Sequence, residues 1–371
     1  MKLKDTVFSV AIILILGWAG STVMAAETAK IDSRLLAAIN SSDNEEFLDV
    51  LLIVADGSRI SIETAKAARR RPDLIGRYQA AYRQLREETA VSQAKLIDLL
   101  HDKMKSGSVA EFQPYWIANA IHLRARADEI RRLATRDDVE QIISNFAVGL
   151  IEPVAKSTAA ATQTGAADNL LSVGARVLWD RGLTGKGQLI CSFDTGVKGD
   201  HSALASKWRG NYTTNTAACW FDPFGSAFPV DASGHGTHVM GIMVGHDGAD
   251  TIGLAPDAQW ICAAVIDRGN SLPQTMNDIL NAFQWAANPD GDPETFDDVP
   301  DVVCNSWGIP SGFMPSCDEK FWEAIDNLES LGIVCIFAAG NEGPNSETMR
   351  NPATRASSPT NTFAVGAVDA A

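Results

Sequence analysis

Short, mostly apolar runs recur through the second half of the chain, and most of them are followed within two residues by Gly or Asp. The runs cover residues 187–193, 258–265, 299–304 and 332–338, and segments with helical patterns, such as residues 169–179, alternate with them. Strands that are apolar on both faces, with helices between them, are typical of a parallel sheet covered on both sides. We therefore expect an α/β fold with a doubly wound parallel sheet over residues 169–371. Its functional groups should gather at the carboxyl ends of the strands.

Residues 28–153 show a different pattern. Apolar residues predict strands at residues 46–55, 115–123 and 147–151, whereas residues 72–105 and 127–142 have the spacing of helices. The order strand, long helix, strand, helix, strand predicts a small α+β domain.

The N-terminus has the three parts of an export signal. Residues 1–4 contain two lysines, residues 7–18 are apolar apart from two positions, and residues 23–25 offer a cleavage site. We expect a signal peptide over residues 1–25 and a secreted protein, extracellular or periplasmic, with no later membrane span. An uncleaved N-terminal anchor is the alternative, although the run is short for a span. Residues 154–168 are small and polar, and they predict an exposed linker.

Charge and composition exclude several classes of function. The 371 residues include 31 Lys and Arg and 46 Asp and Glu, for a formal net charge of −15. Binding to nucleic acid or to anionic lipid needs a basic face, so neither class fits. With 46% hydrophobic and 21% charged residues, the chain is globular. Four of the six cysteines lie in apolar runs, where burial is expected; Cys219 and Cys317 are the candidates for a disulfide.

Two of the predicted strand ends carry residues suited to acid–base chemistry. Asp194-Thr195-Gly196 follows the run 187–193, although such an Asp also suits a turn or a helix cap. In Gly234-His235-Gly236 the His stands between glycines at the start of a helical stretch, and glycines let another backbone approach closely. A metal pair of His235 and His238 is the alternative. No nearby Cys or third His completes such a site, and the zinc motif on a helix uses i, i+4 spacing with a Glu.

A third strand end carries an amide. Ala339-Gly340-Asn341 follows the run 332–338, and an Asn NH₂ held in a Gly-rich turn can donate to a developing oxyanion. The alternative is an Asn that adopts a left-handed turn conformation.

The order Asp, His, Asn at the strands of one sheet domain resembles that of the subtilisin-like serine proteases (subtilases), from about residue 169 to residue 371. The resemblance implies a serine-type endopeptidase that hydrolyses peptide bonds. His235 would act as general base and then as general acid, Asp194 would orient His235, and Asn341 would donate to the oxyanion.

The same resemblance assigns a substrate-binding region. Asn305-Ser306-Trp307-Gly308 is similar to the substrate strand of the bacillopeptidase F-like branch. It implies that Ser306, Trp307 and Gly308 pair with the substrate backbone. Ala339 and Gly340 would wall the specificity pocket.

The family's nucleophilic serine is not found. It stands in a Gly-Thr-Ser-Met-Ala type motif well after the oxyanion Asn, and no Gly-Thr-Ser occurs here. Ser306, Ser357 and Ser358 are not credible replacements. We therefore expect that this sequence is an incomplete part of an active zymogen. Its peptidase domain (169–371) would be truncated and inactive by itself. The alternative is a natural truncation without catalytic activity that binds peptides or inhibits a protease.

The resemblance also implies roles for the upstream segments and the partners. Residues 28–153 are similar in size and element order to the family's inhibitory propeptide, so residues 146–153 would lead into the cleft and self-cleavage would occur within residues 154–168. Expected partners are polypeptide substrates and the chain's own propeptide, with no nucleic acid, and no membrane after signal cleavage.

No cofactor is expected. The resemblance implies that calcium can be bound as a structural ion, but no calcium ligands are assigned in this sequence. A non-catalytic calcium module at the carboxylate-rich residues 288–301 is a further alternative from another class. That stretch lacks the ligand spacing of an EF-hand, and we expect a solvated loop instead.

Overall fold

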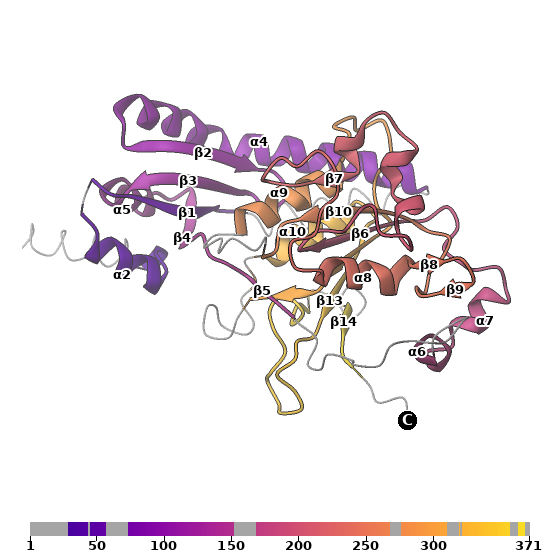
Figure 1. The fold of residues 1–371 in the computed structure, drawn as a ribbon. Helices are drawn as coiled ribbons and strands as arrows, with labels where there is room; N and C mark the ends of the chain where they lie inside the picture. The colour runs from indigo at the N-terminus through magenta and orange to yellow at the C-terminus, as the bar shows by residue number, and fades with distance from the viewer. Residues whose placement is uncertain are drawn as a thin grey trace, which may run out of the picture. The chain divides into compact units, whose positions relative to one another are not determined.

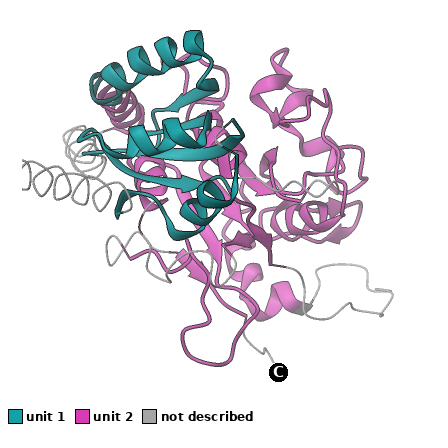
Figure 2. Ribbon diagram, turned by 90° about the vertical axis from the view of Figure 1, so that its left-hand side faces the viewer, with its two compact units in different colours: residues 1–57, 87–145 teal, residues 58–86, 146–371 magenta. Residues whose placement is uncertain are grey.

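The computed structural model describes residues 29–43, 45–56, 73–151, 168–267, 276–309, 319, 321–356 and 363–367. The predicted signal peptide and residues 154–167 of the predicted linker lie outside these ranges. The chain forms two compact units (Figure 2): unit 1 is Met1–Gly57 with Glu87–Asn145, and unit 2 is Ser58–Arg86 with Phe146–Ala371. The boundary between Arg86 and Glu87 falls inside one long helix, α4 (Leu74–Ser106).

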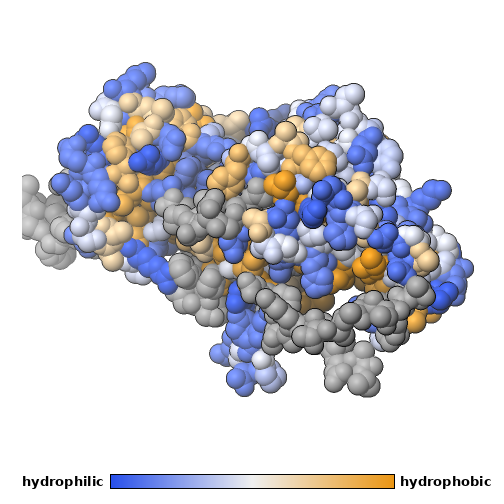
Figure 3. Space-filling view, viewed as in Figure 1, coloured by the Kyte–Doolittle hydropathy of each residue, from blue (hydrophilic) through white to orange (hydrophobic). Residues whose placement is uncertain are grey.

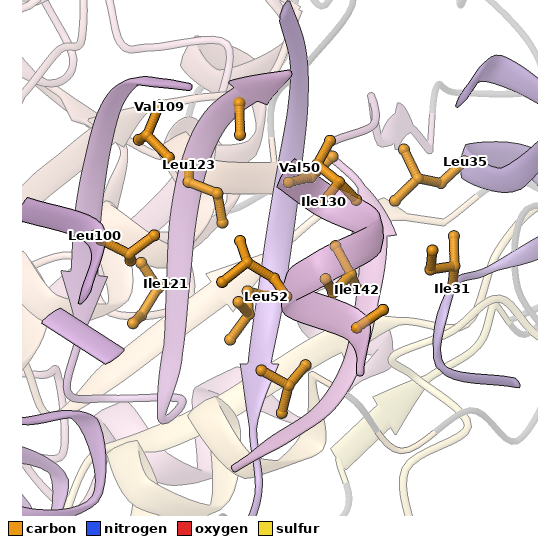
Figure 4. Packing of buried hydrophobic residues seen from close by; sticks show 14 of the residues in the cluster. Ile31, Leu35, Val50, Leu52, Leu100, Val109, Ile121, Leu123, Ile130 and Ile142 are labelled. Carbon is orange, nitrogen blue, oxygen red and sulfur yellow. The ribbon is translucent and has the colours of Figure 1, made fainter. Parts of the chain in front are cut away.

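Unit 1 is built on an antiparallel sheet in the order β2-β3-β1-β4 (Figure 1). The strands are β1 (Phe47–Val54), β2 (Val109–Tyr115), β3 (Ala120–Arg126) and β4 (Val139–Ser144), and the helices α2 (Ser33–Ser41), α5 (Ala127–Ala134) and the later turns of α4 complete the unit. Leu52, Leu100 and Ile130 lie in its apolar core, one each from a strand, from α4 and from α5 (Figure 4). Burial of this shared apolar face supplies the main favourable free energy for the unit.

Two of the elements predicted for this region are wrong in part. Residues 115–123 are not one strand, because β2 ends at Tyr115 and a turn with Asn119 at φ 39° leads into β3. Residues 127–142 are not one helix, because α5 ends at Ala134 and β4 begins at Val139. In β4 the β-branched residues pair with β1 and bury their side chains, so sheet pairing overrides the helical spacing of the polar residues.

Unit 2 contains a six-stranded sheet in the order β14-β13-β11-β6-β10-β7, and all five pairings are parallel. Its strands are β6 (Leu189–Asp194), β7 (Trp220–Phe221), β10 (Gln259–Ala264), β11 (Val302–Asn305), β13 (Val334–Ala338) and β14 (Phe363–Val365). The four longest fall within or beside the predicted apolar runs. The predicted α/β fold with a parallel sheet is confirmed.

Helices cover both faces of this sheet. They are α8 (His235–Val244), α9 (Met276–Ala287) and α10 (Trp322–Ser330). Phe193 of β6 packs on Phe283 of α9 with ring centroids 5.1 Å apart, whereas the next residue, Asp194, faces the start of α8. Because successive side chains of a strand point to opposite faces, α8 and α9 lie on opposite sides of the sheet.

Smaller elements complete unit 2. They are β5 (Gly149–Leu150), α6 (Asp168–Ser172), α7 (Ala175–Trp179), β8 (His246–Asp247), β9 (Asp250–Thr251), β12 (Trp307–Gly308) and three short 3₁₀ turns within residues 205–218. The helix predicted for residues 169–179 is two helices, because Gly174 takes a left-handed conformation at φ 78° between them.

The cysteines test the predicted burial and disulfide, and the helices test the expected lack of a membrane span. Cys191, Cys262 and Cys335 are buried, as predicted, whereas Cys304 is only partly buried. Cys219 is a buried free thiol, so the described residues contain no bridge at this position; its predicted partner Cys317 lies outside them. Hydrophilic and hydrophobic residues intermingle on the face drawn in Figure 3. Within the described ranges, no helix combines the length and the apolar character that a membrane crossing requires.

We predict that Leu52→Ala destabilises unit 1. Leu52 is fully buried, and removing such a side chain costs about 2–5 kcal/mol through lost transfer energy and a cavity. Amide exchange of β1 measures the loss. Val91→Ala on α4, where the side chain is 78% exposed, is the control and should have no such effect. Equal effects of the two substitutions would contradict the proposed core.

Candidate active site

The structure brings Asp194 and His235 together at the carboxyl edge of the sheet. Asp194 is the last residue of β6, and His235 is the first residue of α8, preceded by Gly234 in a left-handed conformation at φ 87°. The Nδ1 atom of His235 lies 2.7 Å from Oδ1 of Asp194, and the two side chains are 8% and 1% exposed. The backbone N–H of Thr195 donates to the same Oδ1 at 2.7 Å. This geometry fixes the orientation of the imidazole ring.

The glycine after His235 has a packing role. A Cβ on Gly236 would lie 2.0 Å from the carbonyl oxygen of Gly196 and 3.0 Å from Cβ of Asp194. Only glycine therefore lets the start of α8 approach the end of β6 closely enough for the Asp194–His235 hydrogen bond. The sequence predicts that another backbone approaches closely at this position. The structure shows that this backbone is the chain's own, at Gly196.

Burial and the partner act in opposite directions on the pKa of His235. Burial favours the neutral ring, whereas the hydrogen bond and the negative charge of Asp194 favour the imidazolium, so the pKa is raised above its ordinary value. Burial also raises the pKa of Asp194, and the hydrogen bond and charge of His235 oppose that rise. The pair is an imidazole base backed by a buried carboxylate.

Asp231 holds the loops of both residues, and the sequence analysis missed it. Its Oδ1 accepts hydrogen bonds from Oγ1 of Thr195 at 2.8 Å and from the backbone N–H of Ser233 and of Gly234 at 3.1 and 2.9 Å. Its Oδ2 accepts from the backbone N–H and Oγ1 of Thr237 at 2.8 and 2.5 Å. The available signal was an Asp in the turn just before a helix start, a position where carboxylates accept from orphan N–H groups.

The substrate strand predicted from the resemblance lies at the same edge. β11 pairs in register with β6 and β13, so Phe193, Asn305 and Phe337 stand side by side and the residues that follow them share one edge. Trp307 is 1% exposed: its indole N–H donates to Oδ1 of Asn305 at 3.1 Å, and its ring packs edge-on against Phe337. The buried indole thus anchors the backbone of β12.

A segment of the chain itself pairs with this strand. β5 runs antiparallel to β12, with Leu150 opposite Trp307 and Gly149 opposite Gly308. The N–H of Ile151 donates to the carbonyl of Ser306 at 3.0 Å. The carbonyl oxygen of Ile151 lies 3.2 Å from Nε2 of His235. The pairing therefore places a peptide carbonyl at Nε2 of the imidazole, the ring nitrogen that does not contact Asp194.

Arg350 supports the other side of this segment. Its Nη1 donates to the carbonyl of Leu150 at 3.2 Å, and its Nε donates to Oε1 of Glu342 at 2.6 Å. The hydrogen bond to Arg350 lowers the pKa of the Glu342 carboxyl. A Cβ on Gly308 would lie 2.7 Å from Cβ of Arg350, which explains the glycine at that position.

The structure places Ala339, Gly340 and Asn341 directly after β13, at the same edge as Asp194. Ala339 bonds through its backbone to Val365 and Arg350, and Gly340 adopts φ 113°. Asn341 is exposed, and its backbone N–H donates to Oε2 of Glu342 at 2.9 Å. Asn341 is thus near the edge but is not part of the Asp194–His235 hydrogen bond.

The described part of this edge contains neither a group of metal ligands nor a serine hydroxyl at Nε2 of His235. Within the described residues, no three His, Cys, Asp or Glu side chains are grouped as metal ligands. In the carboxylate-rich loop, Asp290 and Asp292 accept hydrogen bonds from the loop's own backbone N–H groups. Among the described residues, Nε2 of His235 faces the Ile151 carbonyl and no serine hydroxyl; Ser357 and Ser358 lie outside them.

Comparisons with known proteins identify a family. Residues 185–371, about half of the chain, match the model of the subtilase family. Bacillopeptidase F of Bacillus subtilis (strain 168) is 29% identical over 373 residues, which cover 92% of this chain and 25% of that protein. Minor extracellular protease Vpr of the same strain is 30% identical over 192 residues, or 50% of this chain and 22% of Vpr. The chain therefore spans about a quarter of the length of these relatives.

A solved structure shows a similar fold. Fervidolysin from Fervidobacterium pennivorans, described as a keratinolytic enzyme related to subtilisin, superposes with a TM-score of 0.50 at 16% identity. The superposition covers 83% of this chain and 41% of that chain. At this identity the likeness concerns the fold alone.

We predict that Asp194→Asn lowers the pKa of His235, because burial then remains while the hydrogen bond to a charged carboxylate is lost. Since folding raises the pKa of His235, the pair stabilises the wild-type fold fully below the ordinary value of about 6.5 and loses this contribution as pH rises through the raised value. NMR titration of the His235 ring tests this. Asp247→Asn, an exposed carboxylate bonded to Ser202, is the control. An unchanged His235 titration in Asp194→Asn would rule out the proposed coupling.

We also predict that Asp231→Ala loosens the start of α8. The substitution removes the acceptor of the N–H groups of Ser233, Gly234 and Thr237. Because water can reach the two exposed groups, of Ser233 and Gly234, we expect the loss typical of a removed helix cap, about 0.5–2 kcal/mol. Amide exchange of these three groups should accelerate, while β10 in the sheet stays protected. Unaltered exchange at all three would show that Asp231 does not hold the loop.

Proposed function

Because the chain belongs to the subtilase family, we propose that it is part of the precursor of a secreted, subtilisin-like serine endopeptidase. The predicted family membership is confirmed by the match over residues 185–371 and by the relatives. The observation that carries the proposal is the peptide carbonyl of Ile151, held 3.2 Å from Nε2 of a histidine whose Nδ1 is bound to a buried aspartate.

In the proposed mechanism, the chain's own residues bind and orient the substrate. Ser306, Trp307 and Gly308 add the substrate backbone as an antiparallel strand, as they do for β5. His235 takes the proton of the attacking serine hydroxyl and later gives it to the leaving amine, while Asp194 holds the ring and stabilises the imidazolium. The serine itself is not among these 371 residues and would come from further sequence.

Asn341 would stabilise the oxyanion by donating its side-chain N–H. It follows β13 at the edge where the Ile151 carbonyl lies, and in the present arrangement it is exposed. A donor in this role must point at the oxyanion of the transition state, so its geometry matters most when substrate is bound. Ala339 and Gly340, which precede it, would form one wall of the specificity pocket.

The region before the peptidase domain would act as an inhibitory propeptide. β5 and Ile151 occupy the substrate strand's pairing edge, which blocks entry of another peptide. The sequence predicts self-cleavage within residues 154–168. The contact of Ile151 with His235 favours the bond that follows Ile151 instead, because that carbonyl is the one in reach of the base.

Export is proposed from the N-terminal signal pattern. Residues 1–25 have the order of a signal peptide, and one relative is named an extracellular protease. Polypeptides are the proposed substrates. We propose no cofactor. In the stretch 288–301, Asp290, Asp292 and Asp298 accept hydrogen bonds from backbone N–H groups of the same loop, and Asp297 pairs with Arg209.

A second candidate function is a catalytically inactive protein that binds peptides or inhibits a protease. The observation that favours it is the carbonyl of the chain itself at Nε2 of His235, where an active enzyme needs a hydroxyl. A peptide could bind by pairing with β12 even in a protein that has no nucleophile. The two candidates differ in one chemical property, the presence of an activated serine.

The product of the complete reading frame should react with a fluorophosphonate probe at one serine and should hydrolyse casein. In His235→Ala we expect kcat to fall by a factor on the order of 10⁶, the loss known for the corresponding change in subtilisin. His238→Ala is the matched control, since His238 is exposed three residues later in α8 and should keep full activity. A reading frame that ends at Ala371 and gives no labelled protein would favour the inactive peptide-binding candidate.

A further inference from the structure

The first turns of α4 belong to unit 2 (Figure 2). There they contact a loop of the peptidase region. This loop, residues 288–298, connects α9 to the segment that leads into β11. Tyr78 of α4 is fully buried, and its ring centroid lies 5.2 Å from that of Phe296 and 5.9 Å from that of Tyr82. Tyr78 and Tyr82 are four residues apart, so both lie on one face of the helix.

Polar contacts join the same two elements. The side-chain amide of Asn288 donates to the hydroxyl of Tyr82 at 3.1 Å. The side-chain amide of Gln79 donates to Oε2 of Glu294 at 3.1 Å. Three side chains from two turns of α4, those of Tyr78, Gln79 and Tyr82, thus contact one loop.

Three buried polar atoms at this contact have no hydrogen-bond partner in the described structure. They are the Tyr78 hydroxyl, Oδ1 of Asn288 and Oδ1 of Asp298. Burial raises the pKa of Tyr78, with the neighbouring Tyr82 and Asp298 adding to the rise, so the phenol stays a donor. Burial also raises the pKa of Asp298 to about 6. The helix therefore brings an unused donor to a loop with unused acceptors.

The charges of the two elements are complementary. Residues 74–86 contain three arginines and no carboxylate, whereas residues 288–298 contain five carboxylates and no basic residue. From Glu87 onward α4 contains both signs of charge. The basic character of the helix is thus confined to the turns that meet the acidic loop, and such complementarity favours association in a salt-dependent way.

We propose that loop 288–298 is an exosite of the peptidase that binds the first turns of α4, a basic helix with two tyrosines one turn apart. This inference rests on the proposed function, in which α4 is part of the propeptide. The N-terminal segment is then held at two places in unit 2, by β5 on the substrate strand and by α4 on the exosite.

The consequence concerns regulation. After cleavage behind Ile151, α4 and β5 remain joined by the residues between them, so each contact raises the effective concentration of the other. The cleaved propeptide stays bound and inhibitory until both contacts open. High salt weakens the exosite more than the main-chain pairing of β5, which makes the exosite the salt-sensitive half of the inhibition.

A charge swap in the 371-residue chain tests the exosite. Gln79→Glu places a carboxylate against Glu294, and amide exchange should accelerate at least about tenfold in both residues 74–86 and loop 288–298. Adding Glu294→Gln should restore protection, because the new Gln can donate to the new Glu. Ile75→Ala, at a side chain that is 51% exposed on the same turns, is the control and should change neither segment.

A second variant reads the contact from the other side. Phe296→Ala should accelerate exchange in residues 74–86 while the β6–β10 pairing stays protected, which shows that the unit is still folded. The exosite proposal would be overturned if exchange accelerated only in the mutated element. It would also be overturned if Glu294→Gln did not restore protection in Gln79→Glu. The N–H of Ile151 reports the proposed function separately: fast exchange there in the wild type would refute the occupied cleft even if the exosite results hold.

Discussion

The buried hydrogen bond between Asp194 and His235 sets the geometric requirement for the rest of unit 2. A carboxylate that is 1% exposed needs its hydrogen bonds, and an imidazole must meet it within 2.7 Å. That contact demands a strand ending at Asp194, a helix starting at His235 and no side chain on Gly236 between them. Asp231 then ties the two loops by accepting five hydrogen bonds.

The parallel sheet explains why β12, the proposed substrate strand, lies beside this pair. β6, β11 and β13 are in register, so the residues that follow them emerge at one edge. Trp307 buries its indole below that edge, and this leaves the backbone of β12 available for pairing. β5 uses the available edge, and its register places a carbonyl at His235. Under the proposed function, inhibition by β5 and binding of substrate would use the same backbone hydrogen bonds of β12.

The sequence predicted the parts of the site that depend on strand ends. Asp194, His235 and the 305–308 strand follow apolar runs or glycine-flanked helix starts, and such local patterns carry over into the fold. An Asp just before a helix start signals a cap, but the sequence does not reveal that Asp231 also binds Thr195, which lies 36 residues away in the loop after β6. The strand at residues 139–144 was missed because pairing with β1, a long-range contact, overrides a helical spacing. The contact of Tyr78 with Phe296 joins residues more than 200 positions apart, and no local pattern encodes it.

The most direct measurement is the intact mass of the N-terminal fragment released when the complete reading frame is expressed. The account predicts a fragment whose last residue is Ile151, because that carbonyl lies at Nε2 of His235. It also predicts that purified His235→Ala stays uncleaved. A fragment that ends within residues 154–168, or the same fragment from isolated His235→Ala, would contradict the account.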